Sequence, residues 1–433
     1  MNMIDTILDA LKKTGIETWR VLEKNEESAE LFFVKKQLDT RRTKDTKKYE
    51  VTVYRDGEAD GKKTRGMTQT EILSSDSAEV IETKLSDAYF AAGFAMNPYY
   101  DLPDPVKAPT VVKTGALAEK PLAVSAGIMT EALFAPDHRQ DAFLNSAEIF
   151  VSRYAVRILT SRGTDVSYTD AEITGEYVVQ CREPEDVEMF HQFSYTECEP
   201  EALKKQVEEA LDYVADRARA EKTLKSGEYD VVLCGEELVE VMGYYPERSH
   251  ASMVYAQYST WKPGDDVQKG DAEAVIGEKL NLTLCPTVPY SAEGIPMKER
   301  TLLSDGKMNL IYGPNRFCRY LGIEPTGDYE RFCIENKGSE SVEEMKKKPC
   351  LWAVAFSDFQ MDSFSGHFGG EIRLAYLIDG EKKIPVTGGS INGSLIEAQQ
   401  NFVFSTERYT SAAYEGPYAV RLKKISVAGA VTE

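Results

Sequence analysis

The histidines are the first residues to test for chemistry, because zinc hydrolases bind their metal through imidazole nitrogens and activate water with a nearby glutamate. The chain contains four histidines. They are His138, His191, His250 and His367, and the residues that follow them are Arg139, Gln192, Ala251 and Phe368. None begins a His-Glu pair, and no two are spaced to share a helix face. A helical zinc motif is therefore excluded, whereas metal ligands from distant segments stay open.

Each central histidine has an ordinary structural interpretation. His191 lies in an alternating apolar stretch and is interpreted as a hydrogen-bonded sheet residue. His250 follows Glu247 closely and is interpreted as a polar surface residue. His367 belongs to the glycine-rich segment Ser365–Gly370, where the backbone can approach a ligand closely. Of the three, His367 is the candidate for a binding surface.

Other nucleophile and nucleotide motifs are missing. The seven cysteines are scattered without a Cys-x-x-Cys pair, which is typical of reduced, buried thiols. No Gly-x-Ser-x-Gly, no P-loop and no Gly-x-Gly-x-x-Gly before a helix occurs. The sequence therefore argues against a serine hydrolase, a nucleotide hydrolase and a dinucleotide enzyme.

Composition indicates a folded protein with a strongly acidic surface. The chain has 433 residues and a formal net charge of −20. Nucleic acid is disfavoured as a direct partner, since its binding depends on Lys and Arg side chains. The first residues, Met1–Lys13, lack the composition of a signal peptide, and no run of about 18 apolar residues predicts a membrane span. We expect a cytoplasmic protein that does not enter membranes.

Periodicity predicts the elements that position these residues. The first half should contain three amphipathic helices and an antiparallel meander, joined by a long surface connection. The helices begin near Ile4, with Gly15 as cap, at Asp76, with Glu79 in a capping box and Val80, Ile81 and Leu85 inward, and after Pro200. The strands are Glu30–Lys36, Glu50–Arg55 and several within Ser146–Ser194. The first turn is Asp56–Lys62, Gly163 and Gly175 mark further turns, and the surface connection is Asp101–Pro121.

A domain boundary is expected near residues 225 and 226. Residues 225–228 have linker-like chemistry, and the chain beyond them consists of short strands and glycine turns, including a hairpin from Ile372 to Val386. The predicted fold class is α+β. Residues 1–225 form an N-terminal α/β domain with an antiparallel sheet and amphipathic helices, and residues 226–433 form a β-rich domain of mainly antiparallel strands.

Ordered segments in the second half carry a family resemblance. They are Glu293–Pro296, Arg300–Leu303, Asp305–Gly306, Asn315–Gly322, Thr326–Asp328, Asp362–Gly366, Ile372–Gly380, Pro385–Val386, Ser390–Gly393, Gly416–Tyr418 and Ile425–Gly429. This series resembles the TldD/PmbA family, whose members are called modulators of DNA gyrase and are regarded as metallopeptidases. The resemblance extends more weakly over the first half.

The resemblance also implies where a zinc site would be. Zinc-binding members carry HExxxH on a helix near the start of this half, and the corresponding helix here is Glu236–Tyr245, after the strand Asp230–Leu233. Its apolar positions keep helical spacing and predict a core face: Leu238, Val241, Met242 and Tyr245. Glu237 and Glu240 are interpreted as solvated. Without histidines, the chain is similar to the non-catalytic PmbA/TldE-like branch.

The resemblance implies a subunit of a cytoplasmic zinc peptidase system that acts on unfolded peptides. No catalytic residue, metal ligand or cofactor is assigned to this chain, and zinc is expected only in a TldD-like catalytic partner within a heterodimer. We expect the segment Asp362–Gly370 to bind an extended peptide or a subunit, with Asp362, Ser365, Gly366, His367 and Gly370 as candidates.

Two alternatives stay open. One is a divergent metallohydrolase in which His250 or His367 binds metal with Asp, Glu or Cys from distant segments. The other is a stand-alone homodimer that binds extended peptides without cleaving them.

Overall fold

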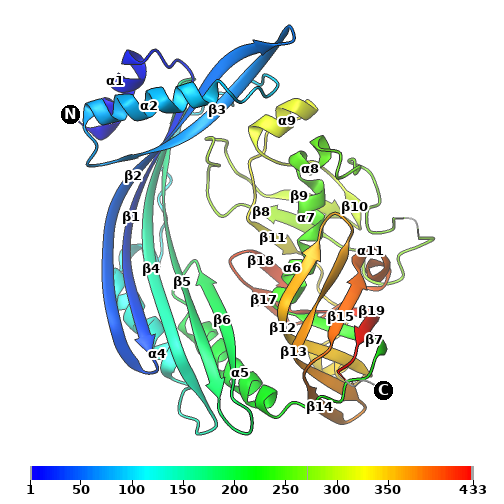
Figure 1. Cartoon of the computed structure of the whole chain (residues 1–433). Coiled ribbons are helices and arrows are strands. Elements are labelled where there is room, and N and C mark those ends of the chain that lie inside the picture. Colours follow the sequence, from blue (N-terminus) through cyan, green and yellow to red (C-terminus); the bar gives the residue numbers. More distant parts are fainter. Residues whose placement is uncertain (1, 271, 431–433) are drawn as a thin grey trace.

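Three β-sheets with flanking helices build the molecule (Figure 1). The structure is a computed structural model that describes residues 2–270 and 272–430. Nearly all strand pairings are antiparallel, so the predicted α+β class is confirmed. Among the described residues, no helix combines the length and the apolar character needed to cross a bilayer.

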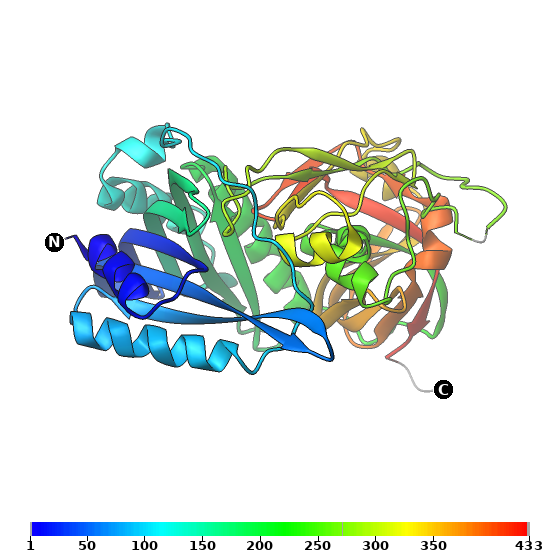
Figure 2. The same cartoon turned by 90° about the horizontal axis from the view of Figure 1, so that it is seen from above.

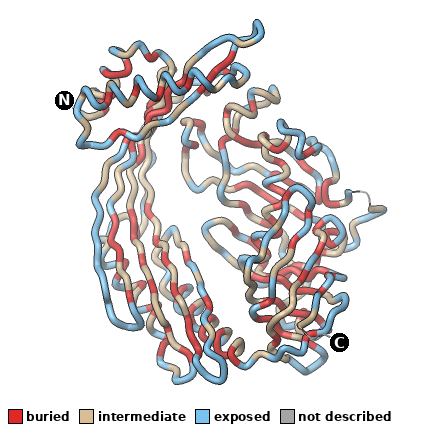
Figure 3. Tube along the Cα trace, viewed as in Figure 1, coloured by how far each residue is buried: buried red, intermediate tan, exposed pale blue. Residues whose placement is uncertain are grey.

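The first sheet is a long meander. Its strands are β1 (Trp19–Val34), β2 (Gln37–Ala59), β3 (Lys62–Leu73), β4 (Ala142–Thr160), β5 (Asp165–Cys181) and β6 (Val187–Tyr195), in the order β3-β2-β1-β4-β5-β6. The strands are longer than predicted because residues 37–45 of β2 are exposed and carry no hydrophobic pattern (Figure 3). Pairing with β1 holds this stretch extended. The first turn is correspondingly shorter than predicted and consists of Asp60 and Gly61.

Five helices cover this sheet. They are α1 (Met3–Lys13), α2 (Ala78–Ala92), α3 (Ala116–Glu119), α4 (Leu122–Phe134) and α5 (Pro200–Ala218). The spacing of Ile4, Ile7, Leu8 and Leu11 predicts the inward face of α1; Ile4, Ile7 and Leu11 are buried against the upper end of the sheet, and Leu8 is partly buried (Figure 1). The N-cap of α2 is Ser77 rather than Asp76, because the Ser77 hydroxyl accepts from the Val80 main chain.

Other predictions for the first half were wrong in detail. Val80 is 42% exposed and does not belong to the buried face of α2. The sequence reading missed α4, whose even hydrophobicity gives no helical stripe. Gly175 lies inside β5 rather than at a turn. Glycine is needed there because a Cβ would stand 2.3 Å from the Phe193 ring. Gly163, with φ of +101°, does turn the chain.

The second half contains two sheets. The smaller strands β8 (Leu282–Cys285), β9 (Arg300–Ser304), β10 (Lys307–Met308), β11 (Arg331–Ile334), β17 (Arg408–Thr410) and β18 (Tyr414–Pro417) form a sheet in the order β10-β9-β8-β11-β18-β17. The other sheet contains β7 (Gly227–Cys234), β12 (Cys350–Asp362), β13 (His367–Asp379), β14 (Lys382–Val386), β15 (Ser390–Ser394), β16 (Val403–Phe404) and β19 (Ala419–Ala428). An additional pairing of β12 with β13 closes this sheet into a ring.

Short helices connect the strands of the second half. They are α6 (Glu236–Met242), α7 (Tyr244–Ser249), α8 (Ala251–Tyr255), α9 (Asn315–Leu321), α10 (Val342–Met345), α11 (Leu395–Ala398) and the 3-10 turn η1 (Gln399–Asn401). The predicted hairpin from Ile372 to Val386 is confirmed as β13 and β14.

The two halves lie side by side in Figure 2 and contact each other at several places, among them an upper and a lower joint. At the upper joint, the Tyr320 hydroxyl of α9 donates to the Pro98 carbonyl at 2.7 Å. At the lower joint, the Tyr376 hydroxyl of β13 donates to Asp216 of α5 at 2.6 Å. Among the described residues, no sheet takes strands from both halves, and the boundary at residues 225 and 226 stays a prediction.

His191 lies on β6 as predicted, but its Nε2 is buried without a hydrogen-bond partner, and its ring stacks on Tyr177 with centroids 5.2 Å apart. Burial lowers its pKa to about 4. The unfolded chain, with an ordinary histidine pKa near 6.5, binds this proton first, so stability is complete above about pH 6.5 and falls towards pH 4. The free energy of unfolding of the wild type should fall on acidification, and we expect His191→Phe to reduce this fall by up to about 3 kcal/mol.

The measurement is urea unfolding of the wild type and His191→Phe at pH 7 and pH 4.5. Comparing the two proteins cancels the titration of other groups. His138→Phe changes an exposed histidine and is the matched control. Equal loss of stability in wild type and His191→Phe would contradict the prediction.

Candidate functional site

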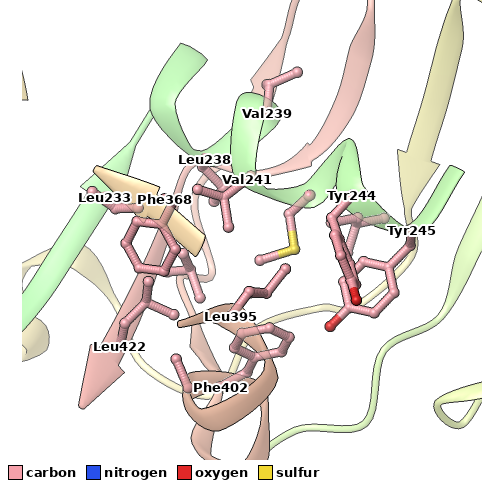
Figure 4. Packing of buried hydrophobic residues seen from close by; sticks show 14 of the residues in the cluster. Leu233, Leu238, Val239, Val241, Tyr244, Tyr245, Phe368, Leu395, Phe402 and Leu422 are labelled. Carbon is pink, nitrogen blue, oxygen red and sulfur yellow. The ribbon is translucent and has the colours of Figure 1, made fainter. Parts of the chain in front are cut away.

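The helix expected to correspond to the zinc-binding helix lies directly after β7. Gly235, with φ of +58°, turns the chain from β7 into α6, a conformation that favours glycine. The predicted core face is fully buried: Leu238, Val241, Met242 and Tyr245. Figure 4 shows Leu238 and Val241 packed beside Leu233 and Phe368. The apolar side chains on this face do not fit a zinc ion, which requires N, S or O ligands.

Two details of this helix differ from the sequence prediction. The helix ends at Met242, and α7 begins at Tyr244 after the junction residue Gly243. Glu240 is exposed as predicted, and its carboxylate accepts from the Met361 main chain at 3.2 Å. Glu237 is only partly exposed rather than solvated, and burial raises its pKa to about 8.

A cavity of about 390 Å³ lies beside α7 and α8. Its wall includes Gly243, Pro246, Glu247, His250, Ser252, Met253, Leu284, Tyr312, Tyr329, Glu330, Arg331 and Phe332. His250 was predicted at the surface, but its side chain is only 22% exposed and contributes to this wall. The cavity combines aromatic, acidic and basic groups, so it has the chemistry to hold a polar ligand or a peptide side chain.

A hydrogen-bonded chain runs through His250. Its Nδ1 lies 2.6 Å from the Ser252 hydroxyl, and its Nε2 lies 3.0 Å from Asp328. Nδ1 also accepts from the Ser252 main chain and so caps α8. Nδ1 is therefore the acceptor, and Nε2 carries the proton donated to Asp328. The sequence did not predict this chain, because Asp328 is 78 residues from His250 and the spacing of His250 and Ser252 alone matches no motif.

His250 and Asp328 form a pair rather than a complete metal site. Within residues 2–270 and 272–430, no three His, Cys, Asp or Glu side chains are grouped so that they could hold a metal ion. Neither α6 nor the cavity wall therefore supplies a ligand set of the kind that structural or catalytic zinc requires.

The candidate binding residues lie on the hairpin of β12 and β13. The predicted loop Asp362–Gly370 is shorter in the structure, because β12 ends at Asp362 and β13 begins at His367. The Ser365 hydroxyl donates to Asp362 and lowers the pKa of that carboxyl. Gly366 turns the chain with φ of +76°, and a Cβ there would stand 2.9 Å from Ile396.

The main chain of β13 has strand neighbours on both sides near these residues. His367 is opposite Asp362 of β12 and Ser394 of β15, while Gly370 is opposite Ile391 of β15. A peptide cannot add to β13 as a new strand there without displacing a neighbour. Strand addition to the main chain of β13 is therefore not open to a peptide while β12 and β15 are paired with it.

A groove of about 750 Å³ nevertheless crosses this surface. It is lined by Ser357, Asp358, Gln360, Met361, Asp362, His367, Phe368, Gly369, Gly370, Glu371, Ser390, Ile391 and Asn392. Asp362, His367 and Gly370 thus share one groove, whereas Ser365 and Gly366 belong to the turn beside it. Whether these residues bind a peptide or a subunit stays a prediction.

Two exposed aromatic rings stand next to the same turn. Phe364 and Tyr258 are each 59% exposed, and their centroids are 5.1 Å apart. Ile396, 44% exposed, packs under Gly366. The Ser363 hydroxyl donates to Glu247 of α7 and fixes the turn against the cavity wall. Phe364, Tyr258 and Ile396 form what we call the aromatic patch.

The second half of the chain matches a known protein family. Residues 226–429 match the family described as the PmbA/TldA metallopeptidase C-terminal domain. The curated proteins provide no significant match.

Solved structures share the fold of nearly the whole chain. TldE from Thermococcus kodakarensis has a TM-score of 0.76 at 15% identity, covering 99% of this chain and 100% of that one. A candidate modulator of a DNA gyrase from Thermotoga maritima has a TM-score of 0.75 at 16% identity, covering 98% and 99%. A similar candidate from Bacteroides thetaiotaomicron has a TM-score of 0.78 at 15% identity, covering 98% of each chain. The domain match assigns residues 226–429 to the PmbA/TldA metallopeptidase C-terminal domain family, and the three solved structures share the fold of nearly the whole chain.

Proposed function

We propose that the chain is a TldE-like subunit of a cytoplasmic peptidase system, and that it pairs with a zinc-bearing TldD-like subunit. The observation that carries the proposal is the core face of α6, where apolar side chains occupy the helix expected to hold HExxxH. Such a subunit contributes binding surface rather than zinc chemistry. Its substrates are unfolded peptides, and the groove of about 750 Å³ on β12, β13 and β15 is the proposed place for them.

The aromatic patch is the proposed contact for the TldD-like subunit. Exposed aromatic side chains are frequent anchors of protein interfaces, and removal of such anchors costs much of the binding energy. Glycine is favoured at position 366, because its positive φ strains other residues and an added Cβ would stand 2.9 Å from the Ile396 side chain. The turn therefore presents Phe364 in one defined position.

Co-expression with a TldD-like protein from the same source tests the assignment. We expect a purified complex that cleaves an unstructured peptide, and we expect Phe364→Ala to weaken the complex by at least about tenfold. Phe90→Ala removes an equally exposed ring, 65% exposed on α2, and is the matched control. Absence of a complex together with unchanged cleavage would reject the subunit role. Stable self-association without a partner would favour the peptide-binding homodimer.

A second candidate function is hydrolysis by this chain alone at His250. It is favoured by the hydrogen-bonded chain of Ser252, His250 and Asp328, in which an imidazole contacts both a hydroxyl and a carboxylate. Metal analysis of the purified chain and labelling with a serine-reactive fluorophosphonate test this candidate. The candidate would be rejected if the purified chain contained far less than one metal ion and if the fluorophosphonate did not label it at a site that Ser252→Ala removes.

A further inference from the structure

A separate cavity of about 460 Å³ lies where the two halves meet near α5 and β13. It is lined by Glu185, Val187, Arg217, Lys222, Glu371, Ile372, Arg373, Thr387, Gly388, Gly389 and Ser390. Three cationic side chains therefore face two carboxylates, in a protein whose net charge is −20. Ligand sites are frequent at such junctions between chain halves.

The cationic groups of this cavity are incompletely neutralised. Arg217 donates to the Glu188 carbonyl, and burial together with the charge of Arg373 lowers its pKa. Arg373 lies 3.8 Å from Glu371, which is longer than a hydrogen bond. In the described part of the chain, Arg217 and Lys222 have no ion pair within 4.0 Å. The guanidinium donors thus remain suited to a further anion, since arginine binds carboxylates in a bidentate manner.

The cavity continues the groove that holds Asp362 and His367. Both are lined by Glu371 and Ser390. Side chains alternate along a strand, and the outward positions of β13 run from His367 through Gly369 and Glu371 to Arg373. Six residue steps of about 3.3 Å give a path of about 20 Å, enough for about six residues of an extended peptide.

The groove has opposite charges at its ends. Asp362 lines the end near the turn, whereas Arg217, Lys222 and Arg373 outnumber the carboxylates of Glu185 and Glu371 at the other end. An extended peptide carries an ammonium group at its N-terminus and a carboxylate at its C-terminus. This polarity favours one orientation, with the peptide carboxylate near the arginines.

We propose that the cavity around Arg217 and Arg373 binds the C-terminal carboxylate of a peptide that lies extended in the groove. The inference rests on the proposed function, because it requires that the chain handles unfolded peptides. It adds that the chain recognises a free chain end, so cleavage fragments and unstructured tails are bound in preference to internal segments.

Two unstructured peptides of identical sequence test this inference, one with a free C-terminal carboxylate and one amidated. Their affinities for the purified full chain are measured by fluorescence anisotropy at low and high salt. We expect the free acid to bind about tenfold more tightly, with a difference that shrinks at high salt. Arg373→Ala and Arg217→Gln should each reduce the affinity for the free acid towards that for the amide.

Arg219→Ala is the matched control, because Arg219 follows α5 but does not line the cavity. Far-ultraviolet circular dichroism identifies any variant that fails to fold. The Arg373 side chain is 47% exposed, so Arg373→Ala should disturb packing least. Equal affinities for acid and amide, or an Arg373→Ala variant that still prefers the acid, would overturn the inference. Failure of both peptides to bind would also overturn it, whereas complex formation with a TldD-like subunit, measured separately, would leave the subunit assignment intact.

Discussion

Tyr245→Ala is expected to lower the free energy of unfolding by about 3–5 kcal/mol, the range for removing a large aromatic side chain from a core. Tyr245 is 0% exposed and packs near Trp261, with centroids 6.2 Å apart. Its hydroxyl donates to Gln399 at 2.8 Å in the buried interior. Such a loss would support a structural role for the α6–α7 face, which is the premise of the proposed subunit role.

Urea unfolding followed by tryptophan fluorescence measures this loss, because Trp261 reports on the same region. Tyr245→Phe separates packing from hydrogen bonding, and leaving the Gln399 oxygen unpaired should cost about 1–3 kcal/mol. Val80→Ala, at an exposed position of α2, should change stability by no more than about 0.5 kcal/mol. A Tyr245→Ala protein as stable as the wild type would refute the expectation.

Glu237→Gln is expected to stabilise the protein at alkaline pH. Burial raises the pKa of Glu237 to about 8, above the ordinary glutamate value of 4.5. A raised pKa favours the protonated carboxyl in the fold, so its contribution is complete below about pH 4.5 and is lost as the pH rises through 8. Between pH 5 and pH 8 the free energy of unfolding of the wild type should therefore fall by up to about 4 kcal/mol, and the variant should not show this fall.

The measurement compares unfolding midpoints of wild type and Glu237→Gln at pH 5 and pH 8. Nearby Cys234 does not complicate that interval, because burial raises its pKa to about 12. Glu240→Gln changes the same chemical group on the exposed side of α6 and is the matched control. A Glu237→Gln protein that follows the wild type at both pH values would show that Glu237 is not buried as its pKa requires.

Elements with a clear hydrophobic period could be predicted from the sequence. The buried stripe of α1 and the apolar face of α6 are where spacing placed them, because burial of one face imposes that spacing. The length of β2 could not be predicted, since cross-strand pairing rather than a buried face holds its exposed part. The helix α4 was missed for a related reason, because its apolar residues surround it evenly.

The candidate sites depended on contacts that spacing does not encode. His250 and Asp328 are 78 residues apart, yet their side chains are hydrogen-bonded. Arg217 and Arg373 come from different halves and meet only because α5 packs against β13 and β14. Glu237 was interpreted as solvated because it lies off the core face of the helix, but surrounding segments cover it in part. Asp362 and His367, in contrast, were neighbours in sequence and share one groove.

The two joints between the halves restrict how the molecule can move. A protein whose halves are linked by one flexible connection has a single hinge, but here the Tyr320–Pro98 contact and the Tyr376–Asp216 contact lie far apart along the boundary. Rotation about either contact must break the other. The two contacts thus restrain the orientation of the groove relative to the first sheet, and such restraint reduces the conformational entropy that is lost when a partner binds.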